Sequence, residues 1–356
     1  MRNLSKKTFL ITGGCGFIGS ALVRSLIKAG NFIINIDKIS YASNLESVEP
    51  VNEENYIFFQ NDINERHILK DIFREYKPDY IIHLAAESHV DRSIDDANEF
   101  MQSNIIGTYS LLDESYKYWA KTKKVLNDDF KFLLVSTDEV YGSINKEKQI
   151  FYENSPIEPN SPYAASKASS DLLARAWNKT YNFPIITTNC SNNYGIWQFP
   201  EKLIPLVIKK CLTNEEIPIY GKGDQLRDWI SVNDHVEALK MVLFDGNIGE
   251  KYNIGSSKEI RNIDMVKIIC SLMDSFEPRE NGIYSDLIIF VDDRPGHDFG
   301  YSLNTDKIRK KLNWSPSIKL EEGLKQTILW YLDNKEWLFG DTEKKYKGQR
   351  LGKLKI

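Results

Sequence analysis

The 356-residue chain is long enough for one large domain or two ordinary ones, and it combines 42% hydrophobic with 27% charged residues at a net charge of −4. This composition is typical of globular proteins, and the small negative charge gives no general attraction to nucleic acid or to an anionic membrane surface. No apolar run approaches the ~20 residues that span a bilayer. Thr8–Ile11 is too short for the apolar core of a secretion signal. We therefore expect no nucleic-acid partner, no membrane partner and a cytoplasmic location.

The four cysteines, Cys15, Cys190, Cys211 and Cys270, are widely spaced along the chain. No two of them have the spacing of a metal site or of a redox motif. Small buried thiols in a reducing cytoplasm are the simplest explanation. We therefore expect no metal site and no disulfide framework.

The first half of the chain alternates short β-branched runs with longer segments of helical length. The expected strands are 8–12, 32–37, 56–61, 80–84, 130–136 and 185–189. The expected helices are 17–29, 65–76, 99–119 and 161–180. Because such alternation is typical of right-handed βαβ units, the sequence predicts an α/β fold with a Rossmann-like, doubly wound parallel sheet.

After about residue 190 the alternation becomes less regular. Short strands are expected at 218–220, 251–254 and 287–291. Helices are expected at 200–212, 234–243 and 320–332. This pattern predicts a smaller C-terminal α/β lobe, which would supply the second wall of a cleft.

A glycine-rich segment follows the first expected strand and reads Gly13-Gly14-Cys15-Gly16-Phe17-Ile18-Gly19. Glycines let the backbone approach a pyrophosphate closely, and the N-terminus of the following helix attracts the anion. Asp37 ends the next strand, where its carboxylate can accept hydrogen bonds from the adenosine ribose and would repel the 2′-phosphate of NADP. The glycine motif alone is weak, but strand, glycines, helix and acid in this order predict bound NAD. Asp62 is expected near the adenine end.

Tyr163 and Lys167 are four residues apart at the start of the expected helix 161–180, so they share one helical face. A nearby cation favours the phenolate, and Lys167 is therefore expected to lower the pKa of Tyr163 from its ordinary ~10 toward neutrality. Tyr163 would then act as a base for a sugar hydroxyl. Such pairs also occur on helix surfaces without any chemistry. Their position after the fifth strand of a dinucleotide fold favours catalysis.

A second group of polar residues begins where the fifth strand ends and reads Ser136-Thr137-Asp138-Glu139. Open α/β sheets bind their ligands at this carboxyl edge. Thr137 can hydrogen-bond the same hydroxyl as Tyr163. Elimination of water needs a base for a carbon-bound proton and an acid for the leaving hydroxyl, and two adjacent carboxyl groups meet that need. An ordinary acidic loop would be the better interpretation if Tyr163 and Lys167 were absent.

These residues belong to a pattern that runs nearly from end to end of the chain. The matching stretches are 12–20, 83–91, 136–142, 161–170, 189–195, 199–205, 227–229 and 293–297. On them the chain resembles the extended short-chain dehydrogenase/reductases and, within these, the family of dTDP-glucose 4,6-dehydratases. Thr137–Glu139 together with Tyr163 and Lys167 is specific, because related epimerases lack the acidic pair and related decarboxylases usually have only the glutamate.

The resemblance implies an NAD-dependent lyase reaction in three parts. Tyr163 would take the proton of the 4-hydroxyl of dTDP-glucose while a hydride passes from C4 to NAD. Glu139 would then remove the C5 proton, and Asp138 would protonate the departing C6 hydroxyl. Return of the hydride to C6 would leave a 4-keto-6-deoxy sugar. NAD would be regenerated and stay bound.

The resemblance also implies two sets of binding residues. NAD would contact Gly13, Gly16, Phe17, Ile18, Gly19, Asp37, Lys38, Asp62, Ile63, Leu84, Ala85, Ala86, Ser103, Tyr163, Lys167 and Asn193. The nucleotide-sugar would contact Ser88, Thr137, Asn192, Lys202, Leu203, Pro218, Ile219, Tyr220, Arg227, Asn262, Arg294, His297 and Tyr346. Lys202, Arg227, Arg294 and His297 are the cations that a pyrophosphate needs in a chain of negative net charge.

From these sets we expect a division of the chain into three parts. An NAD-binding Rossmann domain would cover 1–190, and a later segment near 230–255 would return to it. Residues 191–340 would mainly form the nucleotide-sugar lobe, and 341–356 would be a C-terminal tail. The resemblance further implies a homodimer, in which the helices expected at 99–119 and 161–180 pack against those of a second subunit.

Three alternatives remain open on the sequence alone. One is a 4,6-dehydratase of UDP-glucose or CDP-glucose. Another is a nucleotide-sugar 4-epimerase, which would share NAD, Tyr163 and Lys167 but return the hydride to C4. The third is a non-enzymatic sensor that binds NAD without turnover, against which Tyr163 and Lys167 argue.

Overall fold

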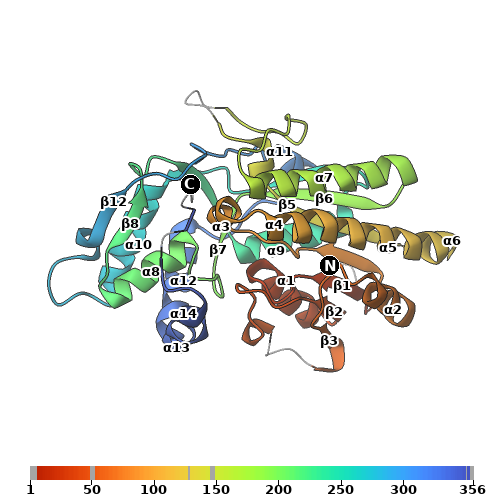
Figure 1. Cartoon of the computed structure of the whole chain (residues 1–356), viewed down its shortest axis with the longest axis horizontal. Helices are drawn as coiled ribbons and strands as arrows, with labels where there is room; N and C mark the ends of the chain where they lie inside the picture. Colours follow the sequence, from red (N-terminus) through yellow and green to blue (C-terminus); the bar gives the residue numbers. More distant parts are fainter. Residues whose placement is uncertain (1–5, 49–52, 127–128, 145–148, 350, 353–356) are drawn as a thin grey trace.

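The computed structural model describes residues 6–48, 53–126, 129–144, 149–349 and 351–352. Of the tail predicted at 341–356, residues 350 and 353–356 lie outside this range. The described residues form a seven-stranded sheet with helices on both faces and a smaller lobe built on two short sheets (Figure 1). Main sheet and smaller lobe together confirm the predicted fold class.

All neighbouring strands of the large sheet run parallel. Their order is β10 (Lys251–Ile254), β6 (Ile185–Cys190), β5 (Lys131–Thr137), β4 (Tyr80–His83), β1 (Thr8–Thr12), β2 (Phe32–Ile36) and β3 (Tyr56–Phe59). The six strands expected in the first half of the chain are all present, with ends within two residues of those predicted. The seventh strand, β10, comes from a later segment and lies beside β6 at the edge of the sheet.

The two faces of the sheet bury alternate residues of each strand, as a period of two requires. Phe9 and Ile11 of β1 pack in one core cluster, whereas Leu10 between them packs in another. The first cluster includes residues of α1 (Phe17–Lys28) and α9 (Val232–Asp245). The second includes residues of α2 (Arg66–Tyr76), α5 (Thr108–Lys121) and α7 (Pro162–Tyr181). The sheet is therefore covered on both sides.

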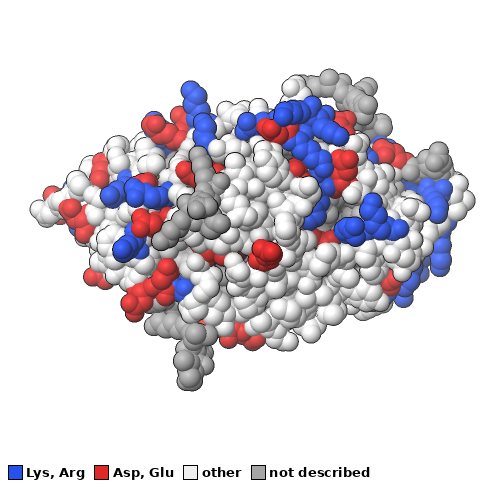
Figure 2. All heavy atoms as spheres, turned by 90° about the horizontal axis from the view of Figure 1, so that it is seen from above, with Lys and Arg blue, Asp and Glu red and all other residues white. Residues whose placement is uncertain are grey.

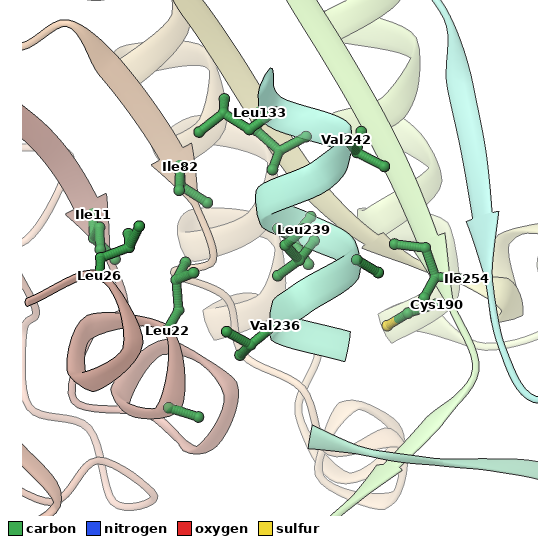
Figure 3. Packing of buried hydrophobic residues seen from close by; sticks show 14 of the residues in the cluster. Ile11, Leu22, Leu26, Ile82, Leu133, Cys190, Val236, Leu239, Val242 and Ile254 are labelled. Atoms are coloured by element: carbon green, nitrogen blue, oxygen red, sulfur yellow. The ribbon is translucent and has the colours of Figure 1, made fainter. Parts of the chain in front are cut away.

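Figure 3 shows the first of these clusters from close by. Leu22 of α1 and Leu239 of α9 lie with Ile82 and Leu133 of the neighbouring strands, and all four side chains are fully buried. Burial of each such side chain contributes about 1.5–3 kcal/mol to stability. Although α9 comes from a late part of the chain, it belongs to the core of the large sheet.

The start of α7 is fixed by local capping, and this places Tyr163 in the first helical turn. The Ser161 hydroxyl accepts a hydrogen bond from the Ala164 N–H at 3.1 Å, and Pro162 occupies the first helical position. Both are favoured at these positions because the first N–H groups of a helix have no partner inside it. Asn182 ends the helix with φ 55°, a left-handed conformation that asparagine tolerates well.

The helix expected at 99–119 differs from the prediction in its periodicity. It consists of α4 (Asn98–Phe100), a π-helical segment (Met101–Gly107) and α5. Within the π segment a Cβ on Gly107 would lie 2.7 Å from Ile63 Cδ1, so a side chain there would force Ile63 to move. The sequence shows apolar spacing but not this local widening, which is frequent at functional sites.

The smaller lobe combines two short sheets with helices. Its strands are β7 (Asn192–Tyr194), β9 (Leu226–Ser231) and β11 (Glu259–Arg261) in one sheet, and β8 (Ile217–Tyr220) and β12 (Ile288–Val291) in the other. Its helices include α8 (Leu203–Thr213), α10 (Asn262–Phe276), α12 (Leu320–Asp333), α13 (Lys335–Phe339) and α14 (Asp341–Lys345). Three further short α-helices of the described residues are α3 (Val90–Asp95), α6 (Lys123–Leu126), which follows α5, and α11 (Asp306–Leu312). The sequence had not indicated β7, β9, β11 or α10.

Charged side chains on the face drawn in Figure 2 form separate groups of both signs between uncharged stretches. Neither sign covers this face, in keeping with the small net charge of the chain. Among the described residues, no helix is both long and apolar enough to cross a membrane. The boundaries proposed between domains stay a prediction.

Candidate active site

A cleft of about 620 Å³ lies where the strands of the large sheet end and the smaller lobe begins. Gly13 follows β1, Asp37 follows β2, Leu84 follows β4 and Asp138 follows β5, and all four line this cleft. Every residue that the sequence assigned to catalysis, to NAD or to the nucleotide-sugar also lines it. The structure therefore brings the whole predicted set together, while the contact of each residue with a ligand stays a prediction.

Gly13 and Gly19 of the glycine segment are packed so closely that a side chain would not fit at either position. Gly13 has φ +73°, and a Cβ there would lie 2.6 Å from the Ala85 nitrogen. A Cβ on Gly19 would lie 2.1 Å from the Gly13 carbonyl oxygen. Gly16 occupies the N-cap position of α1 and has no side chain that could accept hydrogen bonds there. The N–H groups of the first helical turn therefore stay available to a ligand. These features fit a dinucleotide pyrophosphate at the start of α1.

Asp37 is held firmly at the edge of the cleft. Its Oδ2 accepts a hydrogen bond from the Cys15 N–H at 3.0 Å, and its Oδ1 accepts from the Ile39 N–H at 2.8 Å and the Ser43 hydroxyl at 3.0 Å. Burial raises the pKa of Asp37, and these hydrogen bonds oppose that shift. Two carboxylate oxygens offer about four acceptor positions, so the side chain can still receive a ribose hydroxyl. This geometry fits the adenosine end of NAD.

Thr137 is the last residue of β5, and Asp138 and Glu139 begin the short 3-10 helical turn that follows it. The Thr137 hydroxyl accepts a hydrogen bond from the Glu139 N–H at 3.3 Å and lies 3.2 Å from Asp138 Oδ1. Asp138 is only 3% exposed. Its Oδ2 is buried and has no hydrogen-bond partner among the described residues. An unpartnered buried oxygen that lines a cleft is available to a ligand.

The surroundings of the two carboxyl groups raise both pKa values, but not alike. Burial and then the charge of Glu139 raise the pKa of Asp138 well above its ordinary value, with Arg227 opposing. Burial also raises the pKa of Glu139, and three cations, Arg294, Arg227 and Lys202, oppose that shift. Asp138 is therefore the group that keeps its proton, and Glu139 is the group that gives its proton up first.

Tyr163 and Lys167 are both buried beside this turn. The Lys167 ammonium donates a hydrogen bond to the Val135 carbonyl at 2.9 Å, and burial lowers its pKa. Burial and then the charge of Glu139 raise the pKa of Tyr163 well above its ordinary value, while a hydrogen bond with Thr137 lowers it. The predicted net lowering of the Tyr163 pKa is thus wrong, because helical spacing does not reveal desolvation or the facing carboxylate.

The four residues expected as cations around a pyrophosphate, Lys202, Arg227, Arg294 and His297, all line the cleft. Lys202 Nζ donates to the Ser88 carbonyl at 2.8 Å, and the guanidinium of Arg294 pairs with Asp91. His297 is different, since burial and then the charges of Arg294 and Arg227 lower its pKa to about 4. The prediction that His297 acts as a cation is therefore wrong, and it offers a neutral imidazole instead.

Several cleft residues were not assigned from the sequence. Asp91, Glu201 and Trp229 lie inside stretches that carry the family resemblance, so the sequence held a signal for them. Tyr301 also lines the cleft but lies outside those stretches. The Trp229 indole Nε1 is buried without a hydrogen-bond partner among the described residues, which makes it available to a ligand.

Comparison with known proteins agrees with this geometry. The model of the family described as GDP-mannose 4,6 dehydratase matches residues 10–327. The dTDP-glucose 4,6-dehydratase of Neisseria meningitidis serogroup B is 49% identical over 351 residues, which cover 97% of this chain and 99% of that protein. The match therefore includes the glycine segment, the acidic turn and both lobes.

Solved structures show the same fold. The dTDP-glucose 4,6-dehydratase DesIV from Streptomyces venezuelae, with NAD and dTDP bound, has a TM-score of 0.84 and 39% identity and covers 93% of this chain and 98% of its own. A UDP-glucose 4-epimerase from Thermotoga maritima, with UDP-glucose, has a TM-score of 0.81 but only 28% identity, over 92% of this chain and 100% of its own. The chain therefore belongs to the family of dTDP-glucose 4,6-dehydratases.

Proposed function

We propose that the protein is an NAD-dependent lyase that converts dTDP-glucose into dTDP-4-keto-6-deoxy-glucose. The observation that carries this proposal is the pair of adjacent carboxyl groups, Asp138 and Glu139, which line the cleft beside Tyr163. Their surroundings favour a protonated Asp138 and a more readily ionised Glu139. Epimerisation at C4 needs no such acid and base, whereas elimination of water needs both.

The oxidation step depends on Tyr163 and Thr137. When bound, NAD supplies the hydride acceptor for C4 and the hydride donor for C6. Tyr163 takes the proton of the 4-hydroxyl, and the Thr137 hydroxyl, which hydrogen-bonds Tyr163, holds the same oxygen in place. The Lys167 ammonium donates a hydrogen bond to the Val135 carbonyl, and this contact keeps its positive charge beside Tyr163 and Thr137.

The elimination step depends on the acidic pair. The 4-ketone acidifies the proton on C5, and Glu139 removes it as the more readily ionised carboxylate. Asp138 keeps its proton because it is buried and faces Glu139, so it can protonate the C6 oxygen as that oxygen leaves as water. One water molecule is thus lost. When the hydride returns to C6, Glu139 gives its proton back to C5, and the proton that Tyr163 took from the 4-hydroxyl passes to Asp138, so all three side chains regain their starting state.

We further propose the binding residues named from the sequence as the contacts of NAD and of the nucleotide-sugar. The glycine segment and Asp37 support the cofactor set by their geometry. Lys202, Arg227 and Arg294 support a pyrophosphate, since each lines the cleft. The proposal that the site takes a thymine nucleotide is supported by the relatives, which are named dTDP-glucose 4,6-dehydratases. In this scheme 1–190 with 230–255 holds NAD, and 191–340 with Tyr346 of the tail holds the nucleotide-sugar.

A homodimer is the assembly that the exposed surface supports. Leu172 on α7 is 53% exposed, and Ile106 and Tyr109 on the adjoining helical segment are 45% and 39% exposed. Apolar side chains gathered on two neighbouring helices are typical of a protein interface. We propose that these helices pack against their copies in a second subunit. A cytoplasmic location fits the four buried free thiols.

The reaction is tested by incubating the purified protein with dTDP-glucose and reading product mass and NADH absorbance together. We expect a product lighter by one water and a transient NADH signal. An unchanged mass with a changed sugar configuration would identify an epimerase. Parallel turnover of UDP-glucose and CDP-glucose tests the nucleotide. Full activity of Tyr163→Phe would contradict the proposed chemistry.

A further inference from the structure

Three side chains from distant parts of the chain meet beside the cleft. Tyr41 lies in the segment after β2, Arg92 on α3 and Glu201 just before α8. The Tyr41 hydroxyl donates a hydrogen bond to Glu201 Oε1 at 2.7 Å, and Arg92 Nε donates to Glu201 Oε2 at 2.9 Å. The Arg92 guanidinium also lies 3.8 Å from the centre of the Tyr41 ring. Each of the three residues therefore contacts both others.

Burial makes this contact strong. The Glu201 side chain is 1% exposed, and that of Arg92 is 28% exposed. Removing one partner of a buried charge pair leaves the other charge without compensation, which is strongly unfavourable. The cation over the aromatic ring adds a further attraction. Burial and the charge of Glu201 raise the pKa of Tyr41, so the phenol keeps the proton that it donates.

The contact joins two segments that both line the cleft. Ser43 follows Tyr41 by two residues, lines the cleft and donates a hydrogen bond to Asp37, the residue proposed for the adenosine ribose. Phe199 precedes Glu201, lines the cleft and packs edge-on against Tyr41 with ring centres 5.6 Å apart. The first segment belongs to the cofactor side, and the second leads into α8 of the smaller lobe.

We propose that Tyr41, Arg92 and Glu201 form a clasp that retains NAD between turnovers. This proposal rests on the function above, in which NAD is regenerated at the end of each reaction and has no need to leave. A dinucleotide against the glycine segment lies in the cleft that both joined segments line. While the clasp is closed, the two segments cannot separate to release it. The three side chains are positioning residues that act through the segments they join.

The release rate of NAD tests the clasp directly. Purified protein with its bound NAD is mixed with excess alcohol dehydrogenase and ethanol, which reduce every NAD molecule that is released, and NADH absorbance reports the rate. Loss of a buried charge-assisted hydrogen bond corresponds to about tenfold to a hundredfold in an equilibrium constant. We expect Glu201→Ala to release NAD faster by about this factor. Tyr41→Phe, which removes one hydroxyl and keeps the ring under Arg92, should have a smaller effect.

A matched control is Glu321→Gln on α12, which removes an exposed carboxylate paired with Lys325 and should release NAD at the wild-type rate. If Glu201→Ala does not fold, Tyr41→Phe alone decides, because it removes only one hydroxyl. Wild-type release from folded Tyr41→Phe and Glu201→Ala would overturn the proposal. A lower kcat of either variant that saturating NAD does not restore would also overturn the proposal. Product mass on dTDP-glucose tests the proposed reaction separately, so the two failures are distinguishable.

Discussion

Asp138 and Glu139 are neighbours in the chain, yet different charges face each of them. Three cations, Arg294, Arg227 and Lys202, oppose the rise in the Glu139 pKa, whereas Arg227 and a hydrogen bond with Thr137 oppose it for Asp138. Asp138 also faces the negative charge of Glu139 itself. Since the two groups interact, they titrate as a pair, and the first proton to leave comes mainly from Glu139.

The division of roles predicts which step each substitution slows. Asp138→Asn keeps the shape of the side chain but cannot supply a proton, so elimination should slow by about 10²–10⁴-fold. Oxidation at C4 should change only a few-fold, and NADH should therefore accumulate in rapid-mixing absorbance traces. Equal slowing of both steps would contradict the role of Asp138. Glu139→Gln should abolish exchange of the C5 proton with deuterated solvent, which NMR of recovered sugar measures.

The two chemical steps should depend on pH in opposite directions. Tyr163 acts as a base only when deprotonated, and its pKa is raised, so C4 oxidation should become faster as pH rises. Asp138 acts as an acid only when protonated, so elimination should become slower as pH rises through its raised pKa. Single-turnover measurements of NADH formation and of water loss across a pH series separate the two. Persistence of the alkaline decline of elimination in Asp138→Asn would assign that decline to another group.

At the residue scale, the sequence predicted which side chains meet but not all of their protonation states. Tyr163, Lys167 and the acidic pair were placed correctly because each follows a strand end or a helix start. The pKa values of Tyr163 and His297 were misjudged, because both depend on burial by residues that are distant in sequence. Spacing within one helix carries no information on such burial.

At the scale of single elements, the short helix α3 contacts residues of the smaller lobe through one acidic side chain. Its Asp91 pairs with the Arg294 guanidinium and lies 3.3 Å from the Tyr220 hydroxyl, and both partners are proposed substrate contacts. Asp91 itself is buried. It therefore fixes the direction of one cation and one aromatic ring that face the nucleotide-sugar.

Asp91→Asn should raise the KM for dTDP-glucose more than it lowers kcat. The amide has nearly the same shape but loses the charge that orients Arg294, and a hydrogen bond to a charged group contributes about 1.5–3 kcal/mol, or roughly tenfold to a hundredfold. Initial rates over a range of substrate concentrations measure both constants. Asp95→Asn, an exposed acid on the same helix, is the control and should leave KM unchanged. An unchanged KM in Asp91→Asn would show that Arg294 needs no such support.

The same scale shows why some elements were predicted and others were not. Strands such as Thr8–Thr12 have a continuous apolar centre flanked by β-branched threonines and are followed by glycines, so their bounds are evident from the sequence. β7 and β11 have three residues each, too few to show a period of two. α10 was overlooked although its buried Ile263, Val266 and Met273 recur at helical spacing. The π-helical segment Met101–Gly107 has no such signal in the spacing of its residues.

At the scale of the whole molecule, the cleft joins residues that chain order alone does not bring together. Asp91 and Arg294 are 203 positions apart, and Arg92 and Glu201 are 109 apart. Alternation of strands and helices predicts the large sheet, but it does not predict how the smaller lobe closes on it. Resemblance to a known family supplied that arrangement. Tyr301 lies outside the resembling stretches, so the sequence gives no signal for its place in the cleft.

The proposed homodimer gives the last prediction, because its contact surface is exposed in the single chain. Leu172 on α7 is 53% exposed, so replacing it should change the free energy of unfolding by only about 0.5 kcal/mol. Leu172→Glu would, however, place two like charges in the interface and should yield monomers at micromolar concentration, as measured by sedimentation or light scattering. Ile248→Glu, at an equally exposed apolar residue (50%) outside these helices, should remain dimeric. A wild-type monomer, or a dimeric Leu172→Glu, would exclude this surface as the interface.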